Sequence, residues 1–130
     1  MPLEASSASA PDVEALLRSS ATAAKPCFVV VYASLGADGM SWCGDCRDAE
    51  PFVTRKFADS EDVVRIVYAG QRDEWRSADN QWRQAPFSVR YLPTLVKVTG
   101  DGRWEQLVEA DVSNQEKLDA FVGGAQKGDL

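Results

Sequence analysis

A chain of 130 residues, 45% hydrophobic and 26% charged, has the composition of one folded domain and is too apolar to stay disordered. Its 20 acidic and 14 basic residues give a formal charge of −6, and no stretch concentrates enough positive charge to follow the phosphates of a nucleic acid. The longest apolar run, 28–33, is far shorter than the roughly 20 residues that cross a membrane, and the N-terminus does not resemble a secretory signal. We therefore expect a cytoplasmic protein that has neither a nucleic acid nor a membrane as its partner, and we expect a monomer.

Pro11 marks the predicted start of the first helix. Proline is favoured at the first helical position, and the apolar residues that follow it share one face, which predicts a helix over 11–23. The first ten residues are rich in Ala and Ser and are expected to form a flexible N-terminus. We therefore expect a single domain that spans 11–126.

A β-branched run and a glycine-containing loop precede the second predicted helix. The run CFVVVYAS at 27–34 is typical of a central strand that is covered on both faces. The loop LGADGM at 35–40 interrupts this pattern. A helix is then predicted over 43–58, with a kink at Pro51, because proline lacks the N–H that an interior helical residue donates.

The second half of the chain contains three more β-branched runs and a long polar segment. DVVRIVYA at 62–69 predicts another strand. The polar segment 70–91 contains at most short helices, around two tryptophans that we interpret as anchors onto the sheet. Two strands at 93–100 and 103–110, separated by a GDG turn, predict a hairpin at the edge of the sheet.

A C-terminal helix is predicted over 113–124. Ser113 and Glu116 have the spacing of a capping box, and two consecutive glycines indicate the end of the helix. The predicted order is helix, strand, helix, strand, short helices, strand, strand and helix. This order predicts an α/β fold in which helices flank a central mixed β-sheet.

The cysteine and histidine content limits the chemistry of the chain. Three cysteines are few, and odd in number, for a secreted disulfide scaffold, which favours a reducing compartment. The lack of histidine excludes Ser-His and Cys-His nucleophile pairs, histidine metal ligands and the usual proton shuttle near neutral pH. Any chemistry must depend on thiols, carboxylates or the backbone.

The motif SWCGDCRDAEP at 41–51 places Cys43 and Cys46 on the first turn of the predicted helix. At this spacing the two sulfurs can bond to each other, and the free N–H groups of the turn favour a thiolate at Cys43. A thiolate there can attack a disulfide, and Cys46, one turn deeper, can then resolve the mixed disulfide. The motif therefore predicts a two-step disulfide reduction.

Two other interpretations of the cysteines are weaker. A structural zinc site needs four ligands, and the chain offers one CxxC motif, the distant Cys27 and no histidine, so we expect no metal. A pair of ordinary buried cysteines is the second alternative, but such a pair would not normally be flanked by a glycine, an aspartate and a loop. Cys27, at the start of a buried strand, is interpreted as an inert core thiol.

The motif and its surroundings resemble the thioredoxin superfamily. WCGDC follows an apolar strand, precedes a helix that contains Pro51, and is followed by YLPT at 91–94. Asp45 in place of the usual proline, a long loop before the motif and DAEP after it resemble, more narrowly, the thioredoxin domain-containing protein 17 family over about residues 27–122. The resemblance implies a thioredoxin-like fold and a catalytic pair with supporting neighbours: Cys43, Cys46, Trp42, Gly44, Asp45 and Pro51.

The resemblance also implies a function. It implies a cytosolic protein-disulfide reductase that binds no cofactor, whose redox-active Cys43-Cys46 disulfide receives electrons from NADPH through thioredoxin reductase. The implied partners are thioredoxin reductase and selected disulfides, such as cystine and those of oxidised signalling proteins. The family is also associated with binding a dynein light chain, so a non-catalytic, redox-sensitive adaptor is the alternative function.

Leu92 and Pro93 form the second part of the implied site. Sequence alone favours a trans proline, but the fold that the motif resembles has a cis proline opposite the CxxC. We therefore expect a cis bond between Leu92 and Pro93, and a Leu92 backbone that binds a substrate strand. Trp42 is expected to cover the thiols and to line the same surface, the alternative being a plain packing role.

The strand before the motif lacks the buried acid that thioredoxins place behind the second cysteine. Proton transfer to Cys46 must then use water or another carboxylate, of which Asp45 and Glu50 are nearest in the sequence. Asp45 also shares the first helical turn with Cys43, where its charge opposes a thiolate. We expect Asp45 to raise the pKa of Cys43 relative to a site that lacks this carboxylate.

Overall fold

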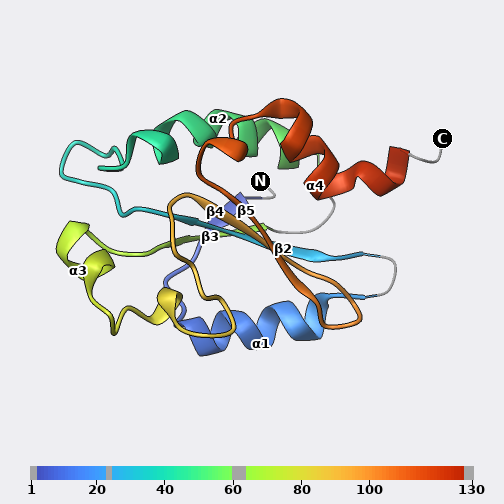
Figure 1. Cartoon of the computed structure of the whole chain (residues 1–130), viewed down its shortest axis with the longest axis horizontal. Helices are drawn as coiled ribbons and strands as arrows, with labels where there is room; N and C mark the ends of the chain where they lie inside the picture. Colours follow the sequence, from blue (N-terminus) through green and yellow to red (C-terminus); the bar gives the residue numbers. More distant parts are fainter. Residues whose placement is uncertain (1–2, 23–24, 60–63, 128–130) are drawn as a thin grey trace.

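A five-stranded mixed sheet forms the centre of the structure, a computed structural model that describes residues 3–22, 25–59 and 64–127 (Figure 1). The strands are β1 (Leu3–Ala5), β2 (Cys27–Tyr32), β3 (Val64–Tyr68), β4 (Thr94–Val98) and β5 (Trp104–Val108). The helices are α1 (Ala10–Ser20), α2 (Gly44–Phe57), α3 (Arg72–Arg76) and α4 (Gln115–Lys127). Helix α1 lies on one face of the sheet, and α2 and α4 lie on the other (Figure 1). These layers confirm the predicted α/β fold with a central mixed sheet.

Strand β2 occupies the middle of the sheet, whose order is β1-β3-β2-β4-β5. It is parallel to β3 and antiparallel to β4. Val29, Val30 and Val31 are fully buried, because helices cover both faces, and the strand therefore has a continuous apolar run instead of an alternation. The prediction of a central strand is confirmed.

Helix α1 begins one residue before Pro11, at a cap that Ser9 provides. The Ser9 hydroxyl accepts a hydrogen bond from the N–H of Asp12, which satisfies one of the free N–H groups of the first turn. The helix ends at Ser20, and residue 23, where the prediction ended, lies outside the described residues. The helix lies on the sheet face opposite to α2 (Figure 1), and its buried side chains belong to the hydrophobic core.

Helix α2 carries the CxxC motif on its first turn and begins at Gly44, with Cys43 as its N-cap. Buried residues recur at helical spacing along its inner face: Cys46, Ala49, Val53 and Phe57. The helix continues through Pro51 to Phe57. Pro51 therefore does not end the helix, and the predicted kink there stays a prediction.

Two strands differ from their predictions. Strand β1 pairs in parallel with β3 and lies within the first ten residues, which we expected to be flexible. Its sequence, LEA, contains no β-branched residue, so no local pattern indicates a strand. The predicted hairpin of β4 and β5 is present, but β4 is not at the edge of the sheet, because it also pairs with β2.

Helix α4 differs from its prediction at both ends. Asn114 caps its start, since the Asn114 side chain accepts a hydrogen bond from the N–H of Lys117 at 3.1 Å. The predicted capping box at Ser113 is therefore wrong. The helix continues to Lys127 across a kink at Gly123, whose backbone is not helical, so the two glycines interrupt the helix without ending it.

The polar segment 70–91 packs against the sheet through aromatic side chains. It contains α3 and a 3-10 helix, Gln81–Arg83. Trp82 is 3% exposed and meets Phe87 edge to face, with ring centroids 5.0 Å apart. Phe87 in turn meets Trp104 of β5 at 5.1 Å. The interpretation of Trp82 as an anchor is confirmed.

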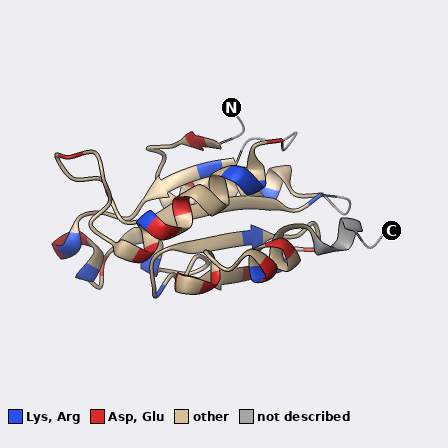
Figure 2. Ribbon diagram, turned by 90° about the horizontal axis from the view of Figure 1, so that it is seen from above, with Lys and Arg blue, Asp and Glu red and all other residues tan. Residues whose placement is uncertain are grey.

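Acidic and basic residues are interspersed over the surface (Figure 2). Helices α2 and α3 each carry both signs. Within the described ranges, no helix is long and apolar enough to cross a membrane.

Candidate active site

Cys43 lies where the loop after β2 enters α2. As the N-cap it has an extended backbone, and its Sγ accepts a hydrogen bond from the N–H of Cys46 at 3.3 Å. The same Sγ lies 3.5 Å from the carbonyl oxygen of Leu92. Cys43 is half-buried. The sulfur is therefore held between a helix terminus and the segment before β4, and it stays partly accessible to solvent.

Cys46 lies one turn deeper in α2 and is 2% exposed. Its Sγ accepts a hydrogen bond from the N–H of Ala33, just after β2, at 3.4 Å. Both cysteines are free thiols, so the structure shows the dithiol form. Because Cys43 is the accessible thiol of the pair, an incoming disulfide meets Cys43 first.

The two thiols differ in acidity because they share a hydrogen bond. The Cys46 thiol donates to the Cys43 sulfur, and this is the main reason why the pKa of Cys43 falls from 9.0 to about 7. The N–H of Cys46 lowers it further, whereas burial and the charge of Asp45 oppose the shift. The same thiol hydrogen bond, together with burial, raises the pKa of Cys46. Near neutral pH, Cys43 is therefore partly thiolate and Cys46 stays protonated.

The peptide bond between Leu92 and Pro93 is cis, as expected from the sequence. Both residues are buried, and the carbonyl of Pro93 accepts a hydrogen bond from the N–H of Glu109 at 2.8 Å. Since the Leu92 side chain is buried, the part of Leu92 that faces Cys43 is its backbone carbonyl. The structure thus brings Leu92, Pro93 and the dithiol together.

Trp42 is held beside the dithiol by the segment that follows β3. Its indole N–H donates to the carbonyl oxygen of Gly70 at 3.0 Å, and the Arg72 guanidinium lies 4.8 Å from the ring centroid. Trp42 is half-buried. The packing role considered for Trp42 is therefore present, and its contact with substrate stays a prediction.

Gly70 and Arg72 were not indicated by the sequence. Gly70 has a φ of +115°, and a Cβ there would lie 2.7 Å from the Cβ of Glu74, so the position requires glycine. Arg72 also donates to the carbonyl oxygen of Trp42 at 3.4 Å. A glycine at the end of a predicted strand was visible in the sequence, but its link to Trp42 depends on the fold.

Ser41 is a further residue of the site that the sequence did not indicate. It is 8% exposed. Its hydroxyl donates to the carbonyl oxygen of Ala33 at 3.0 Å and accepts a hydrogen bond from the N–H of Cys43 at 3.2 Å. Its own carbonyl accepts a hydrogen bond from the Arg47 side chain. Ser41 therefore joins the loop, the end of β2 and the start of α2 around the dithiol.

The other predicted supporting residues, Gly44, Asp45 and Pro51, are exposed on α2. The charge of Asp45 raises the pKa of Cys43, which is the sign predicted from the sequence. A Cβ at Gly44 would lie 3.6 Å from the side chain of Arg47, an ordinary contact, so space does not require glycine there. Pro51 lies farther along the helix than Cys46.

A cavity of about 130 Å³ borders Cys46, and most of its lining residues are exposed, so it is open to solvent. Its walls come from α2, from the loop after β2, and from the ends of β2 and β3. The polar groups that line it include Tyr32, Ser41, Glu50 and Tyr68. The buried side of the dithiol therefore faces polar groups and not a purely apolar core.

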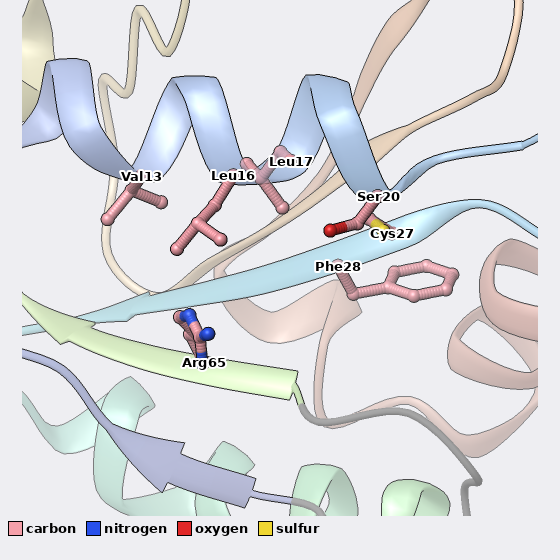
Figure 3. Close-up of a pocket in the computed structure, with 7 residues that line it drawn as sticks. All are labelled: Val13, Leu16, Leu17, Ser20, Cys27, Phe28 and Arg65. Atoms are coloured by element: carbon pink, nitrogen blue, oxygen red, sulfur yellow. The ribbon is translucent and has the colours of Figure 1, made fainter.

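Cys27 lies away from the dithiol. It is half-buried and lines a second cavity, of about 180 Å³, between α1 and the sheet, together with Phe28 and Arg65 (Figure 3). Helices α1 and α2 lie on opposite faces of the sheet (Figure 1), and this cavity is lined by residues of α1. The sequence predicted a core thiol; Cys27 is only partly buried, and it packs against the core while lining this cavity. Among the described residues, no group of three or more His, Cys, Asp or Glu side chains could hold a metal ion.

Comparisons with known proteins agree with this geometry. The family model for the thioredoxin domain of thioredoxin domain-containing protein 17-like proteins matches residues 7–123. Thioredoxin domain-containing protein 17 of Mus musculus is 33% identical over 89 residues, which cover 67% of this chain and 69% of that protein. The thioredoxin-like protein Clot of Arabidopsis thaliana is 38% identical over 66 residues; this match covers 48% of the chain and about half, 49%, of that relative.

Solved thioredoxin structures share the fold. The thioredoxin of Fasciola hepatica has a TM-score of 0.58 at 22% identity, covering 87% of this chain and 90% of its own. The thioredoxin of Malassezia sympodialis has a TM-score of 0.57 at 23% identity, covering 93% and 90%. At these identities the similarity shows the fold alone, and it confirms the thioredoxin-like fold expected from the sequence.

Proposed function

The chain belongs to the thioredoxin domain-containing protein 17-like family of thioredoxin domains, and we propose that it is a protein-disulfide reductase that works by two-step thiol exchange. It is a redox protein of the thioredoxin type. The observation that supports the proposal is the pairing of an accessible Cys43, whose pKa is lowered, with a buried Cys46 one turn behind it. A pair of inert core cysteines would not combine these properties.

In the first step, the Cys43 thiolate attacks one sulfur of the substrate disulfide. A bond forms between Cys43 Sγ and that sulfur, the substrate S–S bond breaks, and the second substrate sulfur leaves as a thiolate that takes up a proton. The carbonyl of Leu92, 3.5 Å from Cys43 Sγ, is placed to accept a hydrogen bond from the backbone of an extended substrate segment. This contact would hold the substrate sulfur in line with Cys43.

In the second step, Cys46 loses its proton and attacks Cys43 Sγ. The Cys43-Cys46 disulfide forms, the bond between Cys43 and the substrate sulfur breaks, and the reduced substrate leaves. The two electrons that reduced the substrate disulfide have then come from the protein dithiol. The positions of Cys43 and Cys46, three residues apart at the start of α2, allow the two sulfurs to bond without moving the helix.

The oxidised protein must be reduced again for turnover. We propose that the electrons come from NADPH through thioredoxin reductase, without a cofactor bound to this chain. We place this reaction in the cytoplasm, whose redox potential keeps dithiols reduced. The substrates are protein disulfides and cystine. Both kinds of disulfide can reach Cys43, because its sulfur is partly accessible.

NADPH consumption with a matched thioredoxin reductase tests this function, with insulin and cystine compared as substrates. We expect turnover with the wild type and none with Cys43→Ser. Replacement of Cys27, which lines the cavity beside α1 (Figure 3), by alanine is the matched control and should leave turnover unchanged. Continued reduction by Cys43→Ser would exclude the proposed mechanism.

A second candidate is a redox-sensitive adaptor that binds a protein partner. Large apolar side chains that are exposed near the dithiol favour it: Leu35 is 43% exposed, Met40 53% and Tyr91 52%. Such side chains suit contacts with a protein surface. The adaptor predicts that a partner is still retained when both Cys43 and Cys46 are serine, and that turnover with thioredoxin reductase is negligible.

A further inference from the structure

Glu50 also lines the cavity that borders Cys46. The two residues are four positions apart on α2, so they share one face of the helix. Both line the cavity of about 130 Å³, together with Tyr32 of β2 and Tyr68 of β3. Glu50 is exposed, whereas Cys46 is 2% exposed. The cavity has room for more than one water molecule, so water can connect the buried thiol with the exposed carboxylate.

Glu50 lines the same cavity as both tyrosines, and its charge acts on both phenols. Burial is the largest cause of the raised pKa of Tyr32, and the charges of Glu50 and Cys46 add to it. The pKa of Tyr68 is likewise raised by burial and then by Glu50. Both phenols therefore keep their protons near neutral pH and can donate hydrogen bonds to water or to the carboxylate.

The second step of the proposed function requires a new acceptor for the proton of Cys46. In the dithiol, Cys46 donates its hydrogen bond to Cys43. Once Cys43 is bonded to a substrate sulfur, it cannot take that proton. The middle of β2 supplies no acid, because its residues there are buried valines. Among the described residues that line the cavity, Glu50 is the one carboxylate, and Asp45 does not reach it.

We propose that Glu50, acting through water in this cavity, accepts the proton that Cys46 loses when it attacks the mixed disulfide. The inference rests on the proposed function. The Cys46 sulfur bonds to Cys43 Sγ, the substrate leaves as a thiolate that takes a proton from solvent, and Glu50 returns its proton to solvent. Protons and electrons therefore balance without a further reactant.

Two donors stabilise the thiolate that forms. The N–H of Ala33 already donates to Cys46 Sγ at 3.4 Å. In the dithiol the Ser41 hydroxyl donates its one hydrogen to the carbonyl oxygen of Ala33 at 3.0 Å, and it can turn that hydrogen toward the Cys46 sulfur, an interaction that lowers the pKa of Cys46. Ala33 and Ser41 therefore hold the anion, while Glu50 takes the proton. In this proposal, proton acceptance and stabilisation of the thiolate are carried out by different residues.

The reaction of the reduced protein with dithiobis(nitrobenzoate) separates the two steps. Attack by Cys43 releases one thionitrobenzoate, and attack by Cys46 on the mixed disulfide releases a second. In a Cys27→Ala background, Glu50→Gln should leave the first phase unchanged and slow the second about tenfold. This is less than the roughly 10²–10⁴-fold of a directly bonded base, because water carries the proton.

Asp48→Asn is the matched control. Asp48 is exposed on α2, two residues after Cys46, and does not line the cavity. Its replacement removes the same charge from the same helix and should leave both phases unchanged. The melting temperature of each variant verifies that the fold is intact.

The pH profile and rescue by added base distinguish proton acceptance from a structural effect. Among the described residues, the titratable or charged groups that face Cys46 or line its cavity are Cys43, Tyr32, Tyr68, Arg47 and Glu50. Without Glu50, hydroxide and buffer are the remaining bases. The second phase of Glu50→Gln should therefore rise more steeply than that of the wild type between about pH 6 and 9, and added imidazole should accelerate it.

The outcomes separate the two proposals. An unchanged second phase in Glu50→Gln, or a slow one that neither higher pH nor imidazole restores, would overturn the role of Glu50 and leave the proposed function intact. A wild type that releases no thionitrobenzoate, or that stops after the first phase, would overturn the proposed function itself.

Discussion

Removal of the Cys46 thiol should make Cys43 a weaker acid. The hydrogen bond from that thiol is the main cause that lowers the pKa of Cys43 from 9.0 to about 7. Cys46→Ala removes the thiol donor and keeps the backbone N–H that donates to Cys43 Sγ at 3.3 Å. Cys46→Ser keeps an O–H donor at the same place and is the matched control.

The expected size of the effect follows from the strength of the lost hydrogen bond. A hydrogen bond to a charged group contributes about 1.5–3 kcal/mol, which is about one to two pKa units. Cys43 is half-buried, so water replaces part of the lost donor, and we expect the lower value. A rise of the Cys43 pKa from about 7 to about 8 lowers the thiolate fraction at pH 7 from about one half to about one tenth. Alkylation at pH 7 should then slow about fivefold.

The pH dependence of iodoacetamide alkylation measures this shift, with the Cys43 adduct identified by mass in a Cys27→Ala background. The midpoint for Cys46→Ala should lie above that for Cys46→Ser, because serine still donates a hydrogen bond. A Cys46→Ala midpoint at or below the wild-type value would refute the reasoning. The N–H groups of the helix terminus would then be the main source of the acidity.

Three further predictions concern neighbouring parts of the site. Asp45→Asn should lower the pKa of Cys43 by about half a unit, since a carboxylate at about 6 Å in a high dielectric contributes roughly 0.7 kcal/mol, and salt should weaken the effect. The pH dependence of alkylation in the Cys46→Ser background measures this shift. An equal or higher pKa of Cys43 in Asp45→Asn would contradict the predicted sign. Cys46→Ser should trap substrates as mixed disulfides that dithiothreitol releases, and recovery of none from an oxidised lysate would count against the assigned order of the thiols. Gly70→Ala should lower the free energy of unfolding by about 1–3 kcal/mol, because φ there is +115° and the new Cβ meets Glu74. Urea unfolding compares it with Gly44→Ala, where the new Cβ makes only an ordinary contact with Arg47, and equal stabilities would contradict the steric argument.

The elements that the sequence predicted well are those whose signals are local. Strand β2 is recognisable because burial on both faces selects a continuous β-branched run. Strand β1 is not recognisable, because its strand conformation depends on pairing with β3 and not on the β propensity of its own three residues. The cap of α4 was misplaced by one residue, since Ser113 and Asn114 are both good capping residues and the choice depends on the preceding turn.

The site divides in the same way. The dithiol could be predicted from spacing, because residues at i and i+3 on a helical turn adjoin whatever the rest of the fold does. The position of Leu92 opposite Cys43 could be predicted only from the resemblance to a family. Ser41, Gly70 and Arg72 could not be predicted, because each acts on a residue that the fold brings near it from another element.

The role proposed for Glu50 was predictable only in part. Its spacing from Cys46 was visible in the sequence, but the groups that it faces come from two strands. The parallel register of β2 and β3 pairs Tyr32 with Tyr68, and their ring centroids are 6.5 Å apart. The two tyrosines therefore line the same cavity as the α2 residues. The strand β2 has no acid behind Cys46. Polar groups from the ends of β2 and β3 and from α2 nevertheless lie beside this cysteine. Because Glu50 is exposed, the proton route that we propose leads to solvent and not into the core, and the second step should therefore respond to bases in the solution.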